Sequence, residues 1–279
     1  MVIIIKNNKK MKAGLVFIPI SVERKDNSFD LSSEVIQAVK KMGEEFLDND
    51  IIAVSSKFIS MSQGRLVNLN DVDVSEEADL LADKLSLDPR LAQLVLQEAD
   101  MIIGGVPGFA LALKNGVIAP NAGIDKSNVP EGHVMLYSEY PFKDAENLKM
   151  AIYQSLGKNV GIVVTDSRLM PLRMGTTGLA ISVAGFEPLE DECGKQDLFG
   201  NILNVTRRAL ADQIASAVQL IMGEADEGFP IVLIRALDGA PWRMTNRLLN
   251  TKTLAVDYDT CIYMKGVLSI NDTYSTSRK

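Results

Sequence analysis

Hydroxyl and carboxylate side chains follow an apolar run in the second half of this 279-residue sequence, at Asp166-Ser167. The run at residues 160–165 predicts a buried strand, so both side chains are expected at its C-terminal end. Open sheets bind ligands at that edge, and the pair is therefore a candidate ligand site. A strand-to-loop turn, in which Asp166 accepts hydrogen bonds from nearby amides, is the alternative.

A second segment rich in oxygen ligands is Asn121–Asn128, which reads Asn-Ala-Gly-Ile-Asp-Lys-Ser-Asn. It follows a predicted hairpin strand and centres on Asp125. Mg²⁺ prefers carboxylate, amide and hydroxyl oxygens, which this segment supplies. An ordinary polar turn would have a similar composition, and that alternative stays open.

Three acidic residues, Glu224, Asp226 and Glu227, gather within the segment 223–228, just after a predicted helix. The negative end of the helix dipole disfavours acids there by about 0.3–1 kcal/mol each. A bound cation would explain their position, whereas a solvated acidic loop is the alternative.

Ser55-Ser56-Lys57 ends a predicted strand with two hydroxyls and one cation, groups suited to phosphate oxygens. A solvated strand end is the alternative, and the spacing alone does not decide between them. The sequence has neither a G-x-x-x-x-G-K-[S/T] loop nor a strand-linked G-x-G-x-x-G, so a nucleotide site would have another construction. His133 is the one histidine, which argues against a Ser-His-Asp device and a histidine-rich zinc site. A site for a hard cation held by oxygen ligands is the kind of metal site that the sequence still allows.

Charge and composition narrow the function classes further. The net charge of −7 opposes nonspecific binding of nucleic acid, and an anionic substrate would need a local field or a bound cation. Cys193 and Cys261 are too few and too far apart for a disulfide framework, which favours a reducing compartment. The apolar run at residues 2–5 is too short for a signal-peptide core, and 18 uninterrupted apolar residues occur nowhere. A cytoplasmic protein with no membrane contact is expected.

The elements that must position these residues follow from hydrophobic periodicity. Strands are predicted at residues 13–20, 51–55, 101–103, 109–114, 117–120, 134–137, 160–165, 179–183 and 231–234. Helices are predicted at residues 30–47, 76–85, 89–99, 143–156 and 202–222. Asn115-Gly116 tolerates the positive φ angles of a type I′ turn and predicts a hairpin. Strands and helices mix without strict alternation, so an α+β or mixed-sheet α/β fold in two closely packed lobes is expected.

Taken together, these segments resemble the coenzyme F(420)-0:L-glutamate ligase family, the γ-glutamyl ligases that extend the tail of a deazaflavin cofactor. The resemblance runs from about Gly14 to Arg235. It is carried by Phe17-Ile18-Pro19-Ile20, Ser55-Ser56-Lys57, Gln63-Gly64-Arg65, Asp88-Pro89-Arg90, Asn121 to Asn128, Thr165-Asp166, Asp191, Gly194, Asp197, Gly200 and Met222-Gly223-Glu224.

The resemblance implies a ligase that uses GTP and Mg²⁺ or Mn²⁺, with K⁺ as a further cation, to add γ-linked L-glutamates to the deazaflavin. It implies an intertwined homodimer with a fold particular to this family. Residues 1–237 would form the catalytic region, and residues 238–279 a C-terminal extension without a match. The substrate carboxylate would attack the γ-phosphoryl group, and the amine of glutamate would displace the resulting acyl phosphate.

The resemblance also implies roles for individual residues. Asp125 and Asp166 would be catalytic, and the metals would be held by Asp125, Asp166, Ser167 and Glu224. The nucleotide would be surrounded by Ile18, Pro19, Ile20, Ser21, Ser55, Ser56, Lys57, Asn128, Met222, Gly223, Glu224, Ala225, Asp226, Glu227, Gly228 and Phe229.

Two departures from the family pattern leave alternatives. Met61 stands where the family often has a second lysine, and Ser167 to Leu172 replaces a Thr and a Gly-Arg step. An amide ligase for another carboxylate acceptor, or a catalytically silent nucleotide-binding relative, are the competing hypotheses.

Overall fold

The computed structural model describes residues 2–7, 10–25, 27–237 and 239–270, and its centre is one mixed sheet. In spatial order the strands are β1 (Val2–Asn7), β2 (Lys10–Ile20), β13 (Ile231–Ala236), β3 (Ile51–Ser55), β9 (Gly161–Leu169) and β10 (Thr176–Ala184). Only β3 and β9 run parallel among these neighbours, while the other pairs are antiparallel. The predicted mixed sheet is confirmed.

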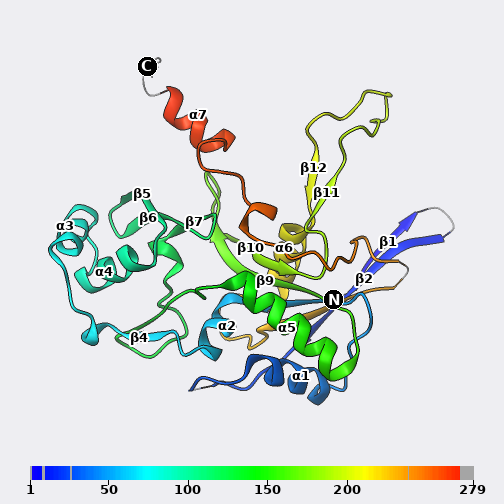
Figure 1. The fold of residues 1–279 in the computed structure, drawn as a ribbon, viewed down its shortest axis with the longest axis horizontal. Coiled ribbons are helices and arrows are strands. Elements are labelled where there is room, and N and C mark those ends of the chain that lie inside the picture. The colour runs from blue at the N-terminus through cyan, green and yellow to red at the C-terminus, as the bar shows by residue number, and fades with distance from the viewer. Residues whose placement is uncertain (1, 8–9, 26, 238, 271–279) are drawn as a thin grey trace.

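Helices cover both faces of this sheet, as Figure 1 shows. They are α1 (Leu31–Lys41) and α5 (Pro141–Leu156) on one face and α6 (Leu210–Met222) on the other. Ile52 and Val54 of β3 pack toward α1 and α5, whereas Ile51 and Ala53 pack toward α6. Because both faces are buried, the central strands are continuous apolar runs.

Close packing between α6 and β10 depends on Gly178. A β-carbon at this position would overlap the backbone of Ala215 in α6. The hydroxyl of Ser216 donates a 2.9 Å hydrogen bond to the Gly178 carbonyl oxygen and fixes the contact. A glycine is therefore required where helix and strand approach most closely.

A smaller antiparallel sheet lies to one side of the main sheet and has its own apolar core (Figure 1). Its strands are β5 (Met101–Val106), β6 (Phe109–Lys114) and β7 (Val117–Pro120), and its helices are α3 (Glu76–Leu85) and α4 (Pro89–Glu98). Asn115 and Gly116 have φ angles of 51° and 76°, so the predicted hairpin turn is confirmed. Short elements connect the two sheets along the sequence. They are α2 (Ser56–Ser62) and β4 (Leu66–Asn68) before β5, and β8 (His133–Met135) after β7.

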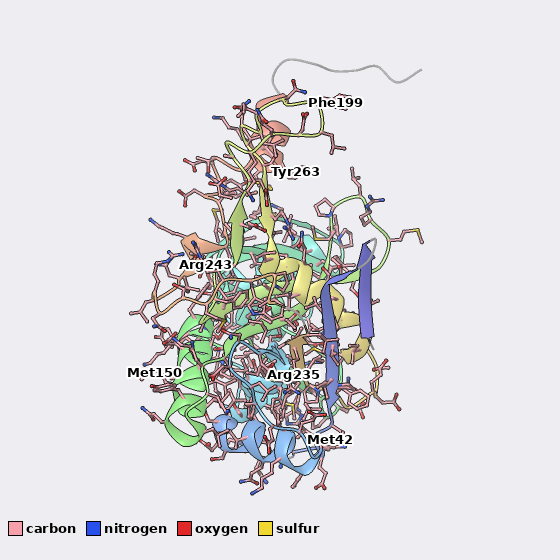
Figure 2. The ribbon with its side chains drawn as sticks, turned by 90° about the vertical axis from the view of Figure 1, so that its right-hand side faces the viewer. Met42, Met150, Phe199, Arg235, Arg243 and Tyr263 are labelled. Atoms are coloured by element: carbon pink, nitrogen blue, oxygen red, sulfur yellow. The ribbon has the colours of Figure 1, made fainter. Side chains whose placement is uncertain are left out.

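A hairpin arm leaves the body of the molecule at β11 (Leu189–Asp191) and returns at β12 (Arg207–Ala209). Figure 2 shows Phe199 at its far end. Leu198, Phe199 and Val205 of this arm are almost fully exposed. The segment after β13 packs back on the sheet, where Trp242 is buried and its indole N–H donates to the Asn49 carbonyl oxygen at 2.9 Å. Helix α7 (Ile262–Ile270) follows.

Three predicted boundaries are wrong. The helix predicted at 202–222 begins only at Leu210, because Arg207 to Ala209 pair with β11 instead. The helix predicted at 30–47 ends at Lys41, since Gly43 has a φ of 76°. The strand predicted to end at residue 165 continues to Leu169, so Asp166 and Ser167 lie inside β9 rather than after it.

The remaining predicted elements occur within a few residues of their expected bounds. Asp30 caps α1 by accepting a 2.7 Å hydrogen bond from the Ser33 amide, and Gly157 ends α5 in the left-handed conformation. None of the helices in the described part of the chain combines the length and hydropathy needed to cross a bilayer.

Candidate active site

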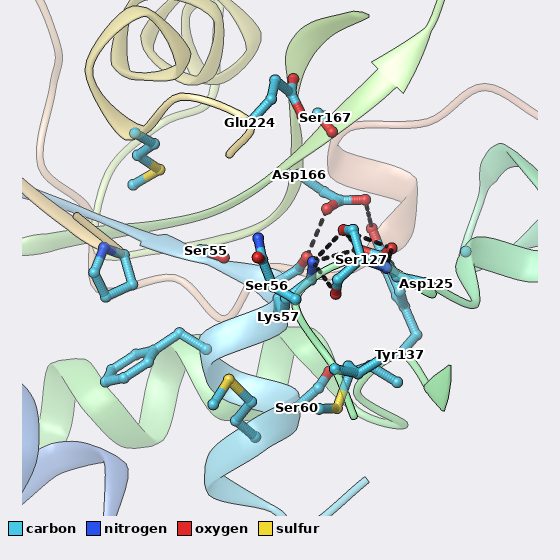
Figure 3. Close-up of a pocket in the computed structure, with 18 of the residues that line it drawn as sticks. Ser55, Ser56, Lys57, Ser60, Asp125, Ser127, Tyr137, Asp166, Ser167 and Glu224 are labelled. Atoms are coloured by element: carbon cyan, nitrogen blue, oxygen red, sulfur yellow. Dashed lines mark hydrogen bonds and ion pairs between the residues drawn. The ribbon is translucent and has the colours of Figure 1, made fainter. Parts of the chain in front are cut away.

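A cavity of about 1010 Å³ opens at the edge of the main sheet where β3 ends. Its wall comes mainly from residues 22–25, 27–28, 55–66, 120–130, 135–137, 165–169 and 219–230. The chain thus brings segments far apart in sequence to one hollow (Figure 3).

The register of β3 and β9 places the first polar groups of the cavity side by side. Ser55 pairs with Thr165 in parallel, so the next residues, Ser56 and Asp166, are neighbours. The Ser56 hydroxyl donates a 2.8 Å hydrogen bond to Oδ1 of Asp166. β3 turns into α2 at this point, whereas β9 continues along β10. Asp166 is therefore held beside the end of β3 by strand pairing.

The other oxygen of Asp166 is held by two buried side chains. Oδ2 accepts a 2.9 Å hydrogen bond from the Tyr137 hydroxyl and lies 2.5 Å from Nη1 of Arg168. Arg168 also donates to the Tyr137 hydroxyl and lies over its ring, 5.0 Å from the centroid. Burial, and then the charge of Asp166, raise the pKa of Tyr137 well above its usual range. Tyr137 stays protonated and acts as a donor.

Asp125 carries a second compensated carboxylate. Its Oδ2 lies 2.5 Å from Nζ of Lys57, and its Oδ1 accepts from the amide of Ser127 at 2.7 Å and from its hydroxyl at 2.8 Å. Burial tends to raise the pKa of Asp125, but the hydrogen bonds from Lys57 and Ser127 outweigh it and lower the pKa. The backbone of Asp125 pairs with Met135, which fixes the loop against β8.

The loop after α6 closes another side of the cavity. Oε1 of Glu224 accepts from the Thr176 hydroxyl at 2.6 Å and from Nε2 of Gln219 at 2.8 Å. Asn128 donates to the Ala225 carbonyl oxygen at 2.9 Å and so joins this loop to the loop of Asp125. The Glu227 carboxylate folds back on its own backbone and accepts from the Ala225 amide at 2.8 Å.

The donor atoms fit a hard cation in type. Asp125, Asp166, Ser56 and Ser127 present only oxygen atoms, the ligands that Mg²⁺ and Mn²⁺ prefer. Within the described ranges, no three His, Cys, Asp or Glu side chains are grouped closely enough to hold one ion. Lys57 and Arg168 instead neutralise the two central carboxylates in this conformation.

Most residues expected at the site do line this cavity. They are Ser55, Ser56, Lys57, Asp125, Asn128, Asp166, Ser167, Met222, Gly223, Glu224, Ala225, Asp226, Gly228 and Phe229. Ile18, Pro19 and Ile20 lie in β2, where they pair with β13, and neither they nor Ser21 nor Glu227 line it. Val22 to Lys25 line it in place of the preceding strand residues.

Tyr137 and Arg168 are the site residues that sequence reasoning missed. A signal existed for Arg168, which stands two positions after Asp166 and therefore on the same face of an extended strand. Tyr137 has no such local signal, because it follows β8 and reaches Asp166 only through the tertiary fold.

A second hollow of about 410 Å³ adjoins the cavity and shares Phe109, Asn121 and Ile124 with it. The remaining wall is partly apolar, with one cation, Lys126. Asp125 lines the first cavity, its neighbour Lys126 lines the second hollow, and Ile124 lines both. The loop that carries these three residues therefore separates the cavity from the hollow.

Comparison with known proteins gives one consistent result. A family model described as F420-0:Gamma-glutamyl ligase matches residues 20–236. The coenzyme F420:L-glutamate ligase of Methanopyrus kandleri is 36% identical over 220 residues, 78% of this chain and 86% of that protein. Enzymes of the same name from Methanothermobacter thermautotrophicus and Archaeoglobus fulgidus are each 36% identical, over 76% and 70% of this chain and 84% and 78% of their own lengths.

Proposed function

Because this chain belongs to the F420-0:gamma-glutamyl ligase family, we propose that it joins L-glutamate to a deazaflavin coenzyme through γ-linkages at the expense of GTP. One observation supports this proposal at the level of individual residues. The compensated carboxylates Asp125 and Asp166 and the phosphate-suited Ser56 and Lys57 share one cavity (Figure 3). The cavity thus combines acidic ligands for a cation with donors for a polyphosphate.

The nucleotide is proposed to lie along the end of β3 and the loop after α6. Hydroxyl groups of Ser55 and Ser56 and the ammonium group of Lys57 would donate to phosphate oxygens. Asn128, which already binds the Ala225 carbonyl oxygen, would keep the two loops at a fixed separation around it.

Asp125, Asp166, Ser167 and Glu224 are proposed to hold the metal ions, Mg²⁺ or Mn²⁺, between them, since no three acidic side chains of the described residues are close enough to hold a single ion. Divalent cations there would neutralise charge on the phosphates. K⁺ is a further cation proposed from the family resemblance alone.

The proposed chemistry needs no covalent bond to the protein. A carboxylate oxygen of the acceptor attacks the γ-phosphorus, the bond to the β-phosphate oxygen breaks, and GDP leaves. The amine nitrogen of glutamate then attacks the acyl carbon, phosphate leaves, and the amine proton passes to phosphate or solvent. Lys57 would stabilise charge on the transferred group, and closure of the site would keep water from the acyl phosphate.

The adjoining hollow is proposed to hold the ring system of the acceptor. It shares a wall with the cavity, and Phe109, whose side chain is half-exposed between the two, offers a face for stacking. A ring bound there would direct the acceptor's carboxylate past Ile124 toward Asp125.

Mass spectrometry tests this function directly. Purified protein is mixed with the unglutamylated deazaflavin, L-glutamate, GTP and Mn²⁺, beside Asp166→Ala and the exposed control Asp83→Ala of α3. We expect a mass gain of one or more glutamyl units in wild type and control, and none in Asp166→Ala. Intact deazaflavin under saturating conditions in the wild type would refute the assignment.

One observation supports a second candidate, an amide ligase for another carboxylate acceptor. Leu169 lines the cavity and Leu172 is fully exposed, and both lie in the segment Ser167 to Leu172 that departs from the family pattern. GTP turnover that is stimulated by a different carboxylic acid, with the deazaflavin unchanged, would favour it. Tight GTP binding without any turnover would instead favour a catalytically silent relative.

A further inference from the structure

Each central carboxylate of the site is already bound by a cation of the protein itself. Arg168 Nη1 lies 2.5 Å from Asp166, and Lys57 Nζ lies 2.5 Å from Asp125. The two pairs sum to zero charge. Glu224, the remaining acidic ligand proposed, accepts from two neutral donors among the described residues, Thr176 and Gln219. A free divalent cation therefore meets little uncompensated negative charge at Asp125 and Asp166.

Lys57 and Arg168 differ in how firmly their side chains are held. The Lys57 side chain is 22% exposed and ends a flexible stem, so it can exchange Asp125 for a phosphate group. The Arg168 side chain is only 8% exposed, donates to Tyr137 and lies over its ring. Its Nε is buried without a hydrogen-bond partner among the described residues. Arg168 is thus held in place as a permanent charge.

Arg168 and Tyr137 together occupy one oxygen of Asp166. Both bind Oδ2, whereas in the part of the chain that the structure describes Oδ1 accepts only from the Ser56 hydroxyl, which can rotate. A metal ion can therefore approach Asp166 through Oδ1 alone. The guanidinium charge lies across the same carboxylate and repels that ion.

We propose that Arg168 is a positioning residue that makes binding of the divalent cation depend on the nucleotide. It fixes Asp166 for coordination through one oxygen and disfavours a cation that arrives alone. The phosphates of GTP supply the missing negative charge, so cation and nucleotide enter together. This inference rests on the proposed function, because the metal site is part of it.

Titration of the nucleotide-free protein with Mn²⁺, followed by the loss of the free-ion EPR signal, tests the proposal. Arg168→Gln removes the charge but keeps hydrogen-bond donors, and Arg168→Lys, the matched control, keeps the charge. We expect Arg168→Gln to bind Mn²⁺ about tenfold more tightly than wild type or more, because a unit charge a few ångströms away is removed. Arg168→Lys should bind as weakly as wild type.

Two results would overturn the proposal. Unchanged Mn²⁺ affinity in Arg168→Gln would show that the charge does not oppose the cation. Equal tightening in Arg168→Lys would show that side-chain geometry, rather than charge, matters. If Arg168→Gln fails to fold, as judged by thermal unfolding, Arg168→Met replaces it. Methionine also lacks the charge and has an unbranched side chain, so the same gain in Mn²⁺ affinity is expected.

The measurement is independent of ligase turnover. It contains no deazaflavin, glutamate or GTP, so failure of the mass-spectrometric assay leaves its outcome interpretable. Conversely, a wild-type enzyme that glutamylates the deazaflavin while Arg168→Gln leaves Mn²⁺ affinity unchanged would refute only the role of Arg168.

Discussion

Lys57 is the mobile cation of the site, and its contacts define what its loss should do. Its Nζ lies within hydrogen-bond distance of Asp125 and of both the carbonyl and hydroxyl oxygens of Ser127. It thus orders the loop that carries Asp125, and because it lines the cavity its ammonium group can exchange Asp125 for a phosphate. Binding of GTP and positioning of Asp125 are expected to depend on the same side chain.

Lys57→Met should lower kcat/KM for GTP by about 10- to 150-fold, since a charge-assisted contact of about 1.5–3 kcal/mol is lost. Lys57→Arg, which keeps the charge, is the control and should lose less. The steady-state rate of GDP release measures both variants. Equal activity of Lys57→Met and wild type would contradict the phosphate role.

The pKa of Asp125 gives this contact a pH signature. Burial opposes ionisation, yet Lys57 and Ser127 lower the pKa below its usual value. The stabilising contribution of the pair is therefore present above the unfolded pKa, about 3.9, and is lost as pH falls through the lower folded value. Lys57→Met should raise the pKa of Asp125, as followed by carboxyl ¹³C NMR, and an unchanged pKa would be inconsistent with the ion pair.

Asp212 shows the opposite sign. Burial raises the pKa of Asp212. Its Oδ1 accepts a 3.0 Å hydrogen bond from the Ala180 amide, which lowers the pKa but only partly offsets the effect of burial. A raised pKa contributes stability below the unfolded value, and that contribution is lost as pH rises through the folded value. Asp212→Asn should therefore unfold at a higher temperature than wild type at pH 7, and the two should converge below about pH 4. A lower melting temperature of the variant at pH 7 would contradict this.

Among the elements, those with strong local signals were predicted within a residue or two, and those set by distant pairing were not. The β6–β7 turn has Asn-Gly, and α4 begins with an Asp cap and a proline, so both follow from sequence. The last residues of β9 are polar or exposed, and only pairing with β10 makes them a strand.

The arm shows the same limit more clearly. Apolar residues at 202–222 recur at helical spacing, but Arg207 and Arg208 pair with Asp191 and Glu190 across β11 and β12. These partners lie sixteen and eighteen residues away, outside the window in which periodicity is informative. Asp125 and Asp166 could be predicted from their local sequence, whereas the Tyr137–Arg168 contact required the tertiary structure.

The β6–β7 turn also contacts the segment after β13, which a glycine substitution can test. A β-carbon on Gly116 would overlap Thr251 and Ala255, whereas one on Gly43, with the same φ of 76°, would meet nothing within 4 Å. Both alanine variants incur a left-handed penalty of about 1–2 kcal/mol, and Gly116→Ala should lose more because of the overlap. Urea unfolding measures the difference in unfolding free energy. Equal losses in the two variants would show that Thr251 and Ala255 move aside at no cost.

For the molecule as a whole, the segment after β13 belongs to the folded body. Trp242 is 6% exposed in the core beneath α6, and the following chain reaches the β6–β7 turn of the smaller sheet. Trp242→Ala should cost about 3–5 kcal/mol of unfolding free energy. Leu248→Ala, at a 75% exposed position of the same segment, is the control and should cost little. Calorimetric unfolding of both decides between a structural segment and an appendage.

Assembly is the other property at this scale. The family resemblance implies an intertwined homodimer, and the arm exposes Leu198, Phe199 and Val205 as an apolar surface with no cover from the described chain. Phe199→Asp should shift the protein toward the monomer in light scattering coupled to size exclusion, while Asn204→Asp, at an exposed polar position of the same arm, should not. A monomeric wild type at micromolar concentration would contradict the homodimer.

Trp242 is the one tryptophan of the sequence, so the indole held against the Asn49 carbonyl oxygen is also a built-in optical probe. Its emission maximum should lie at short wavelength while the segment is docked and move to longer wavelength when water reaches the ring. Stopped-flow fluorescence of the unlabelled protein can therefore time the detachment of this segment separately from global unfolding, which circular dichroism records.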